Sequence, residues 1–286
     1  MTYLMFNPRS KNGNAQLQLE KLRNLLKGEQ VKQIKVTEIK NYRKFFNEID
    51  DDDTIYLLGG DGTLNHFIND TDGIDIKNRI FYCPGGTGND FFKDVENDKD
   101  NNGLVELNKY IEKLPEVEIN GKKMRFINGI GFGIDGYCCE EGDRLQAQSD
   151  KPVNYTSIAI KGLLFKFKPA NAVVTIDSVK KEYKKVWLAP TMNGRLYGGG
   201  MMVAPAQDRL NPERTLTNVV MHGSGKLKTL MVFPSIFKGE HISHKEMVSV
   251  NTGKEITVTF DRPCALQIDG ETVKNVTSYT ARSCNV

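Results

Sequence analysis

The sequence has no long hydrophobic run and little excess charge of either sign. None of its apolar stretches reaches the roughly 20 residues that cross a bilayer, and no charged-then-apolar leader opens the chain. The net charge is only +3 over 286 residues. Without a basic stripe carrying interleaved aromatic residues, nothing suggests nucleic acid, although a membrane surface or an acidic ligand stays open. We therefore expect a cytoplasmic protein.

Cysteine and histidine are also scarce. The five cysteines are an odd number, Cys138 and Cys139 are adjacent, and no CxxC pair suggests zinc, so we expect reduced thiols. His241 and His244 stand three residues apart and could in principle share a metal, but no third ligand stands near them in the sequence. Surface or packing roles are the preferred interpretation of both.

The most informative stretch is a strand followed by a glycine-rich turn. Thr54–Leu58 is a short apolar run between an acidic cluster and glycines, which is typical of a buried strand. A periodic segment begins at Leu64, and the turn before it consists of Gly59, Gly60, Asp61, Gly62 and Thr63. Such a turn directs backbone amides at a ligand, and the dipole of the following helix favours an anion. We expect a phosphate group here.

A second turn repeats this pattern. Ile80–Cys83 is another short apolar strand, and it is followed by Pro84, Gly85, Gly86, Thr87, Gly88, Asn89 and Asp90. A single glycine-rich turn is equally consistent with a ligand-binding turn and with the ordinary end of a strand. Two such turns after consecutive strands would lie side by side at the carboxyl edge of a parallel sheet, where open α/β folds bind ligands.

The two turns together resemble the motif pair of the soluble bacterial diacylglycerol kinase family of lipid kinases. The first motif is shared by the whole superfamily, which includes NAD kinases, sphingosine kinases and 6-phosphofructokinases. The second motif is more specific for lipid kinases. Asn7–Ala15 also resembles the family's NPxSGxGxA segment, with Ser10 and Gly13 matching and Lys11 replacing the first glycine.

Residues 1–116 are predicted to form the nucleotide-binding domain. Strand-like runs and segments with helical spacing alternate along it, and they are Tyr3–Phe6, 17–26, Val31–Val36, 41–49 and Thr54–Leu58. This order predicts an α/β domain with a doubly wound parallel sheet. A last helix around Leu104–Leu114 is expected to close the domain.

Residues 117–286 are predicted to form a β-rich lipid-substrate domain, an antiparallel β-sandwich. Its short alternating runs are Val117–Ile119, Val173–Ile176, Val186–Ala189, Val219–Met221, Glu255–Phe260 and Ala265–Ile268. One helical segment, Tyr155–Phe167, is basic and apolar. It could touch an anionic bilayer, but a helix that covers the sheet is the more frequent explanation.

Two glycine-rich stretches of this half are nucleotide-motif lookalikes. Gly223–Lys226 lacks the first glycine and the Ser/Thr of a P-loop, and we discard it. Gly131–Gly136 matches GxGxxG, but it stands among β-type runs with no evident helix after it. It more closely resembles the lipid kinases' NxxGxGxDA stretch, with Gly136 in place of the alanine, and the matching residues are Asn128, Gly131, Gly133 and Asp135.

Asp269-Gly270-Glu271 follows a strand near the C-terminus, and by itself this tripeptide favours an ordinary hairpin. It also matches the DGE motif of the resembled family, in which the glutamate is thought to take the proton from the lipid hydroxyl. Asn193–Arg195, Gly198–Met201 and Ala204–Pro205 resemble further family segments, so the resemblance spans nearly the whole chain.

One departure from the family concerns a structural magnesium. The family commonly has DDGxLD after the Ala-Pro pair, and its acidic groups help hold that ion in some bacterial members. Here the comparable stretch is Asn211–Val219, in which Glu213 remains but Arg214 stands beside it. We predict that this magnesium site is weakened or absent.

The resemblance implies transfer of the γ-phosphoryl group of ATP to a lipid hydroxyl, with roles for specific residues. Phosphate contacts are expected from the amides of Gly59, Gly60, Gly62, Thr63, Gly85, Gly86, Thr87, Gly88 and Asn89, with Asn7, Ser10 and Asn65 around the nucleotide. Asp61 and Asp135 are expected to hold Mg²⁺ directly or through water. Glu271 is expected to be the general base, with the acceptor entering a cleft between the domains.

Three functions are carried forward. The first is a lipid kinase with diacylglycerol as the expected acceptor, in transient peripheral contact with the inner membrane surface. The resemblance also suggests a homodimer, since members of the family are often dimers. The second is a small-molecule kinase such as NAD kinase, against which the Gly-Thr-Gly-Asn-Asp and Asp-Gly-Glu motifs argue. The third is a non-catalytic nucleotide-binding regulator, suggested by Lys11 and Arg214.

Overall fold

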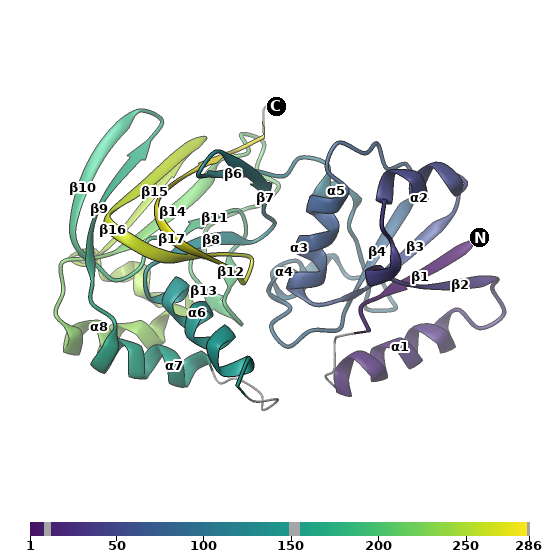
Figure 1. Cartoon of the computed structure of the whole chain (residues 1–286), viewed down its shortest axis with the longest axis horizontal. Helices are drawn as coiled ribbons and strands as arrows, with labels where there is room; N and C mark the ends of the chain where they lie inside the picture. Colours follow the sequence, from purple (N-terminus) through teal and green to yellow (C-terminus); the bar gives the residue numbers. More distant parts are fainter. Residues whose placement is uncertain (9–12, 149–154, 285–286) are drawn as a thin grey trace. The chain divides into compact units, whose positions relative to one another are not determined.

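The computed structural model describes residues 1–8, 13–148 and 155–284. The chain divides into two compact units, Met1–Lys113 and Leu114–Val286, which carry the purple-to-blue and the teal-to-yellow elements of Figure 1. Ser10 and Lys11 lie outside the described residues. Among the described residues, no helix combines the length and the hydrophobicity that crossing a bilayer requires.

The N-terminal unit is built on a five-stranded sheet with the order β2-β1-β3-β4-β5. Its strands are β1 (Thr2–Phe6), β2 (Val31–Lys35), β3 (Thr54–Gly59), β4 (Arg79–Pro84) and β5 (Val105–Glu106). β2, β1, β3 and β4 are parallel, and only the short edge strand β5 runs antiparallel to its neighbour.

Helices cover both faces of this sheet, because alternate strand residues are apolar on both sides. On one face Leu4, Leu58 and Cys83 pack with Leu19 and Leu22 of α1 (Gly13–Leu25). On the opposite face, Tyr3 packs on Phe45 of α2 (Tyr42–Glu48) and Tyr82 packs on Phe91 of α4 (Asp90–Asp94). The pair Tyr42–Phe67 joins α2 to α3 (Asp61–Asp70). The predicted doubly wound α/β architecture is confirmed.

The predicted helix over Leu104–Leu114 is wrong in its first part. Val105 and Glu106 pair with Tyr82 and Phe81 of β4, and only Asn108–Ile111 is helical, as α5. The segment before α5 is tied to the sheet edge instead, since the Leu107 amide donates to the Ile80 carbonyl at 2.7 Å and the Asn108 side-chain oxygen accepts from the Ile80 amide at 2.9 Å. The remaining helical turns of this unit are η1 (Val36–Glu38) and η2 (Glu96–Asp98).

The C-terminal unit contains an antiparallel ten-stranded sheet with the order β15-β14-β11-β8-β16-β17-β6-β7, and β9 and β10 branch from β16. A separate pair, β12 and β13, completes the strands. Their bounds are β6 (Glu116–Ile119), β7 (Lys122–Arg125), β8 (Gly129–Phe132), β9 (Ala170–Ile176), β10 (Val179–Val186), β11 (Thr191–Met192), β12 (Leu196–Tyr197), β13 (Met201–Met202), β14 (Leu216–Met221), β15 (Val248–Gly253), β16 (Glu255–Ile268) and β17 (Glu271–Arg282).

β16 links the two parts of this branched sheet. Two separate strands were predicted here, but the structure has one continuous strand of 14 residues with a register irregularity around Cys264. Its first part pairs with β9 and its last part with β8, while β17 follows it along the other edge. Phe132, Phe260 and Tyr279 pack together where these strands meet, so the branch point is also part of the core.

Helices cover one side of this unit. They are α6 (Ile134–Gln146), α7 (Tyr155–Lys161), the π-helical turn η3 (Gly162–Lys166), α8 (Lys226–Val232) and the 3₁₀ segments η4 (Phe233–Lys238) and η5 (Glu240–Ser243). Ile134, Leu163 and Val232 of these segments pack in one buried cluster with Trp187. The predicted helical segment over Tyr155–Phe167 is present as α7 and η3.

Candidate functional site

The first glycine-rich turn joins β3 directly to α3. β3 ends at Gly59 and α3 begins at Asp61, with Gly60 as the N-cap residue. A Cβ atom on Gly59 would lie 2.4 Å from the Cβ of Thr63, so only glycine lets the strand end pack against the first turn of the helix. The predicted strand, turn and helix are therefore present.

The second turn lies directly against the first. The Gly85 amide donates to the Gly59 carbonyl at 2.8 Å, and a Cβ on Gly86 would lie 2.6 Å from the Gly60 Cα. The two backbones are thus in contact, with no room for a side chain between them. The expected pairing of the turns at the carboxyl edge of the parallel sheet follows from this geometry.

Asp61 binds the second turn through its carboxylate. The amides of Asp90 and Phe91, in the first turn of α4, donate to the two Asp61 oxygens at 3.1 and 3.2 Å. A carboxylate at this place satisfies amides that lack helical partners and stabilises the positive end of the helix dipole. Sequence reasoning assigned Asp61 to Mg²⁺ and missed this capping role, because the contact joins residues 29 positions apart.

Asn89 gives the second turn its shape. It has a left-handed backbone, with φ of 51° and ψ of 44°, and its side chain both accepts from the Gly86 amide and donates to the Gly86 carbonyl. Asparagine tolerates this conformation better than most residues. The Asn89 side chain is therefore engaged in closing its own turn, and its side-chain contacts are with protein backbone.

The other nucleotide-contact candidates differ in accessibility. Asn7, just after β1, donates to the Thr63 hydroxyl at 3.1 Å and so joins a third loop to the first turn. Thr87 is exposed, and Gly62 and Gly88 are partly exposed. Asn65 is only 2% exposed and lies inside α3, so its side chain faces the interior. Ser10 is outside the described residues.

Asp135 belongs to the C-terminal unit, in the first turn of α6. Tyr197 donates to its Oδ2 at 2.8 Å, while Oδ1 is buried without a hydrogen-bond partner in the described part of the chain. Burial raises the pKa of Asp135 to about 6. A buried carboxylate with one unpaired oxygen can bind a cation or accept a proton.

The glycines around Asp135 allow α6 to approach β16. A Cβ on Gly131 would lie 1.6 Å from Asp135 Oδ2, and one on Gly136 would lie 2.0 Å from the Ala265 carbonyl oxygen. The latter contact explains the glycine at a position where the resembled family has alanine. The expectation that no helix follows this stretch is wrong, because α6 begins at Ile134 directly after β8.

Asp269 and Glu271 occupy the hairpin between β16 and β17. Asp269 and Gly270 have φ of 48° and 96°, as a tight two-residue turn between paired Ile268 and Glu271 requires. The Asp269 carboxylate accepts from the amides of Ile127, Asn128 and Gly129 at 2.7, 2.8 and 3.0 Å. Sequence reasoning missed this anchoring role. Glu271 follows as an exposed residue at the start of β17.

A buried cation of the protein itself, Arg209, lies just before the stretch Asn211–Val219 that departs from the family. Arg209 is 7% exposed, and its guanidinium donates to the Ile127 carbonyl at 3.0 Å and to Asn128 Oδ1 at 3.3 Å. Glu213, by contrast, is exposed and pairs with Lys254 at 3.2 Å. Among the described residues, no group of three or more His, Cys, Asp or Glu side chains is placed to hold a metal.

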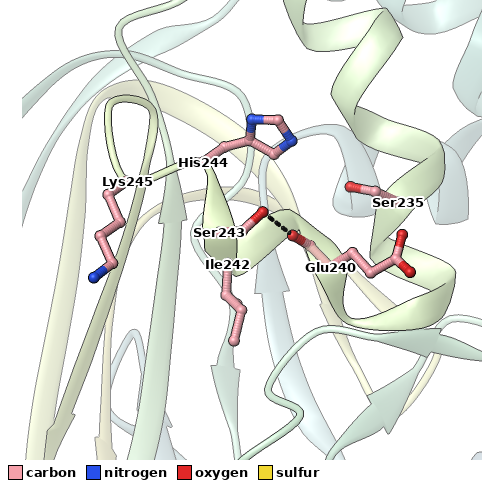
Figure 2. A pocket seen from close by; sticks show the side chains of 6 residues that line it. All are labelled: Ser235, Glu240, Ile242, Ser243, His244 and Lys245. Atoms are coloured by element: carbon pink, nitrogen blue, oxygen red, sulfur yellow. Dashed lines mark hydrogen bonds between the residues drawn. The ribbon is translucent and has the colours of Figure 1, made fainter.

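The histidine pair is divided between two environments. His241 is fully buried and its Nε2 lies 3.0 Å from the Val203 carbonyl oxygen, whereas His244 is half-buried beside Glu246. Figure 2 shows His244 at a surface hollow with Ser235, Glu240, Ile242, Ser243 and Lys245, in which the Ser243 hydroxyl donates to the Glu240 carbonyl. None of the motif residues lines this hollow, and we assign no function to it.

Comparison with known proteins finds a matching family model for each unit. The family model of the diacylglycerol kinase catalytic domain matches residues 1–116, and that of the YegS C-terminal NAD kinase beta sandwich-like domain matches residues 128–282. A diacylglycerol kinase of Mycobacterium tuberculosis (strain ATCC 25618 / H37Rv) is 27% identical over 218 residues, which cover 74% of this chain and 67% of that protein.

Solved structures agree on the fold. The crystal structure of a diacylglycerol kinase from Bacillus anthracis str. Sterne matches 99% of this chain and 93% of its own, with 18% identity and a TM-score of 0.63. Two further structures from that organism have TM-scores of 0.69 and 0.68. Since one family model spans more than half of the chain and the other most of the remainder, the chain belongs to the diacylglycerol kinase family of lipid kinases.

Proposed function

We propose that the protein transfers the γ-phosphoryl group of ATP to the hydroxyl of a lipid, with diacylglycerol as the acceptor and phosphatidic acid as the product. Family membership supports a kinase that acts on lipids. The observation that carries the proposal is the contact between the two glycine turns, in which Gly60 and Gly86 meet backbone to backbone. Phosphoryl transfer depends mainly on positioning and charge neutralisation, which such a surface of amides can supply.

The phosphate groups of ATP are proposed to bind the amides of the two turns. The first contributes Gly59, Gly60, Gly62 and Thr63, and the second contributes Gly85, Gly86, Thr87, Gly88 and Asn89. Glycine matters here because a ligand can then approach the backbone closely. Asn7 and Ser10 are proposed to contact the remainder of the nucleotide. The burial of Asn65 favours an indirect role for that residue, in supporting α3.

Asp61 and Asp135 are proposed as ligands of the Mg²⁺ that accompanies ATP. Both are carboxylates, the donor type that this ion prefers, and Asp135 Oδ1 is a buried oxygen that lacks a partner in the described part of the chain. The Asp61 carboxylate is held by the amides of Asp90 and Phe91, and it would meet the ion through a water of the ion's hydration shell. When bound, the ion would neutralise charge on the phosphates.

Glu271 is proposed as the general base. It would accept the hydroxyl proton of the lipid as the hydroxyl oxygen bonds to the γ-phosphorus and the bond from that phosphorus to the leaving ADP oxygen breaks. Its exposure leaves the carboxylate accessible. The anchoring of neighbouring Asp269 by three amides would hold the backbone of this turn in place during the reaction.

The proposal is tested by incubating the protein with γ-labelled ATP and each acceptor separately, followed by thin-layer chromatography. Diacylglycerol, phosphatidylglycerol, a monoacylglycerol, a sphingoid base and NAD are the acceptors. We expect label in phosphatidic acid, and about a hundredfold less or lower still when Glu271 is replaced by Gln or Asp61 by Ala. Label on NAD alone would identify a small-molecule kinase. ATP binding without transfer to any acceptor would indicate a regulator.

A further inference from the structure

Three large apolar side chains are exposed on neighbouring helical segments of the C-terminal unit. Leu227 and Met231 of α8 are each 74% exposed, and Phe165 of η3 is 77% exposed. Leu227 and Met231 are four residues apart and thus lie on one face of α8. Because α8 packs beside η3, we call this surface, with its adjoining lysines Lys161, Lys166, Lys226 and Lys228, the α8–η3 face.

The fold itself does not use these three side chains. Other residues of the same segments provide the packing, since Leu163 and Val232 are buried in the cluster around Trp187. α7 and α8 lie at the same end of this unit, below its strands in Figure 1. Leu227, Met231 and Phe165 therefore present apolar surface outward from helices that are already anchored, which is typical of an interaction surface.

The two segments that carry these side chains have charged residues of one sign only. Residues 155–168 contain three lysines and residues 222–239 contain three more, and neither segment has an aspartate or glutamate. Lys226 and Lys228 flank Leu227, and Lys166 follows Phe165. The acidic residues nearest to them come from other segments, since Lys228 pairs with Glu246 at 2.9 Å and Lys166 stands 3.9 Å from Glu141.

We propose that the α8–η3 face docks on the surface of an anionic phospholipid bilayer. Leu227, Met231 and Phe165 enter the boundary between headgroups and acyl chains, and the lysines meet the lipid phosphates. A bilayer fits both features, because it offers an apolar layer directly beneath an anionic one, and lysine stems can extend between the two. The biological purpose of this contact rests on the proposed lipid-kinase function, but the contact itself occurs without the reaction.

The test measures co-sedimentation of the full chain with vesicles in the absence of ATP. One vesicle type is phosphatidylcholine alone, and the other contains equal amounts of phosphatidylcholine and phosphatidylglycerol. We expect binding to the anionic vesicles, weakened by salt, and weak or no binding to phosphatidylcholine. The double variant Leu227→Gln/Met231→Gln should lower the partition coefficient by about tenfold or more, given the area of two buried side chains.

A matched control removes exposed apolar side chains elsewhere. Val179 is 72% exposed on β10 and Val250 is 50% exposed on β15, and Val179→Gln/Val250→Gln should bind vesicles as the wild type does. The double variant Lys226→Gln/Lys228→Gln should weaken binding to anionic vesicles by roughly tenfold, since each lysine near the surface contributes a several-fold factor. Unchanged thermal unfolding would confirm that all three variants are folded.

The inference is overturned if wild-type protein ignores both vesicle types, if it binds them equally, or if the control variant loses as much binding as Leu227→Gln/Met231→Gln. Activity provides a separate readout. On acceptor dispersed in detergent, the Leu227→Gln/Met231→Gln variant should match the wild type, whereas on acceptor in vesicles it should be slower. Failure of the proposed function would instead abolish transfer by every variant in both conditions, with vesicle binding intact.

Discussion

The carboxylate of Asp61 accepts the backbone amide of Asp90 at 3.1 Å, so the acidic residue of the first glycine turn caps the helix that follows the second. The neighbouring amide of Phe91 donates to the other oxygen. Any ligand that rests on both turns is thus bound to a single hydrogen-bonded structure. Asp61 has a structural role that does not require a bound metal, and measurements of stability and of activity can distinguish it from the proposed metal role.

Replacing Asp61 with Asn should destabilise the N-terminal unit by about 1–2 kcal/mol, because an amide offers one acceptor oxygen where the two helix amides need two. Phosphoryl transfer should fall by about a hundredfold or more if Asp61 also holds the charge of the metal and nucleotide. Thermal unfolding with and without Mg²⁺, together with the labelled-ATP assay, measures both effects. Asp75→Asn, at an exposed position, serves as control. An unchanged unfolding temperature for Asp61→Asn would contradict the capping role.

Gly86→Ala should separate the two turns. Its Cβ would lie 2.6 Å from the Gly60 Cα, and a backbone atom cannot rotate away as a side chain does. We expect a loss of about tenfold or more in ATP affinity, in line with the 1–3 kcal/mol typical of overpacking. Titration calorimetry with a non-hydrolysable ATP analogue measures it.

Gly85→Ala is the matched comparison for that variant, because its Cβ would meet the end of the flexible Leu58 side chain at 3.0 Å. It should bind the analogue more tightly than Gly86→Ala does. Equal affinities for the two variants would show that contact between the turns is unimportant for the ligand.

Asp269 and Glu271 should respond to mutation in opposite ways. Asp269→Asn places an NH₂ group among three donor amides and should cost about 2–3 kcal/mol of stability. Glu271→Gln alters an exposed side chain and should change stability by less than about 0.5 kcal/mol, while transfer falls by roughly a hundredfold or more if it is the general base. Chemical denaturation and the kinase assay distinguish the two. A Glu271→Gln enzyme with full activity would refute the proposed base.

His241 should make the C-terminal unit sensitive to acid. Burial lowers its pKa to about 4, so the folded protein keeps the ring neutral where the unfolded chain, with the ordinary value near 6.5, takes up a proton. The unfolded state therefore binds more protons between these values, and stability falls as the pH falls through that window. Between pH 7.5 and 5 the loss should be about 2 kcal/mol.

His241→Gln tests this prediction, since a glutamine amide can still donate to the Val203 carbonyl without titrating. The variant's unfolding temperature should fall less than that of the wild type over the same pH range. Parallel pH profiles for the two proteins would show that another group is responsible.

The parts of the site that could be predicted from the sequence are local. Gly59 to Thr63 and Gly85 to Asn89 follow apolar strands and precede helices, so the pattern of neighbours alone gives strand, turn and helix. The Asp61 contact with Asp90 and the Asp269 contacts with residues 127 to 129 join distant segments. No local sequence pattern indicates such pairs. Asp61 was therefore assigned to Mg²⁺ binding, and Asp269 to a turn.

Strands of polar sequence were missed for a similar reason. β10 carries five charged residues, and among the described strands it pairs with β9 alone, so its other edge is exposed and tolerates them. The end of β17 alternates the buried residues Tyr279 and Ala281 with polar ones, and its position beside the long β16 supplies the hydrogen bonds that its own composition does not predict. In both cases, pairing with a neighbouring strand determines that the segment is extended.

Arg209 has a consequence for how the protein depends on ions. Its guanidinium is part of the chain, so the positive charge next to the Ile127 carbonyl and Asn128 cannot be removed by a chelator. We therefore expect a chelator to leave the stability of this part of the C-terminal unit unchanged. Under the proposed function, a loss of phosphoryl transfer on chelation would then be separate from any loss of folded protein.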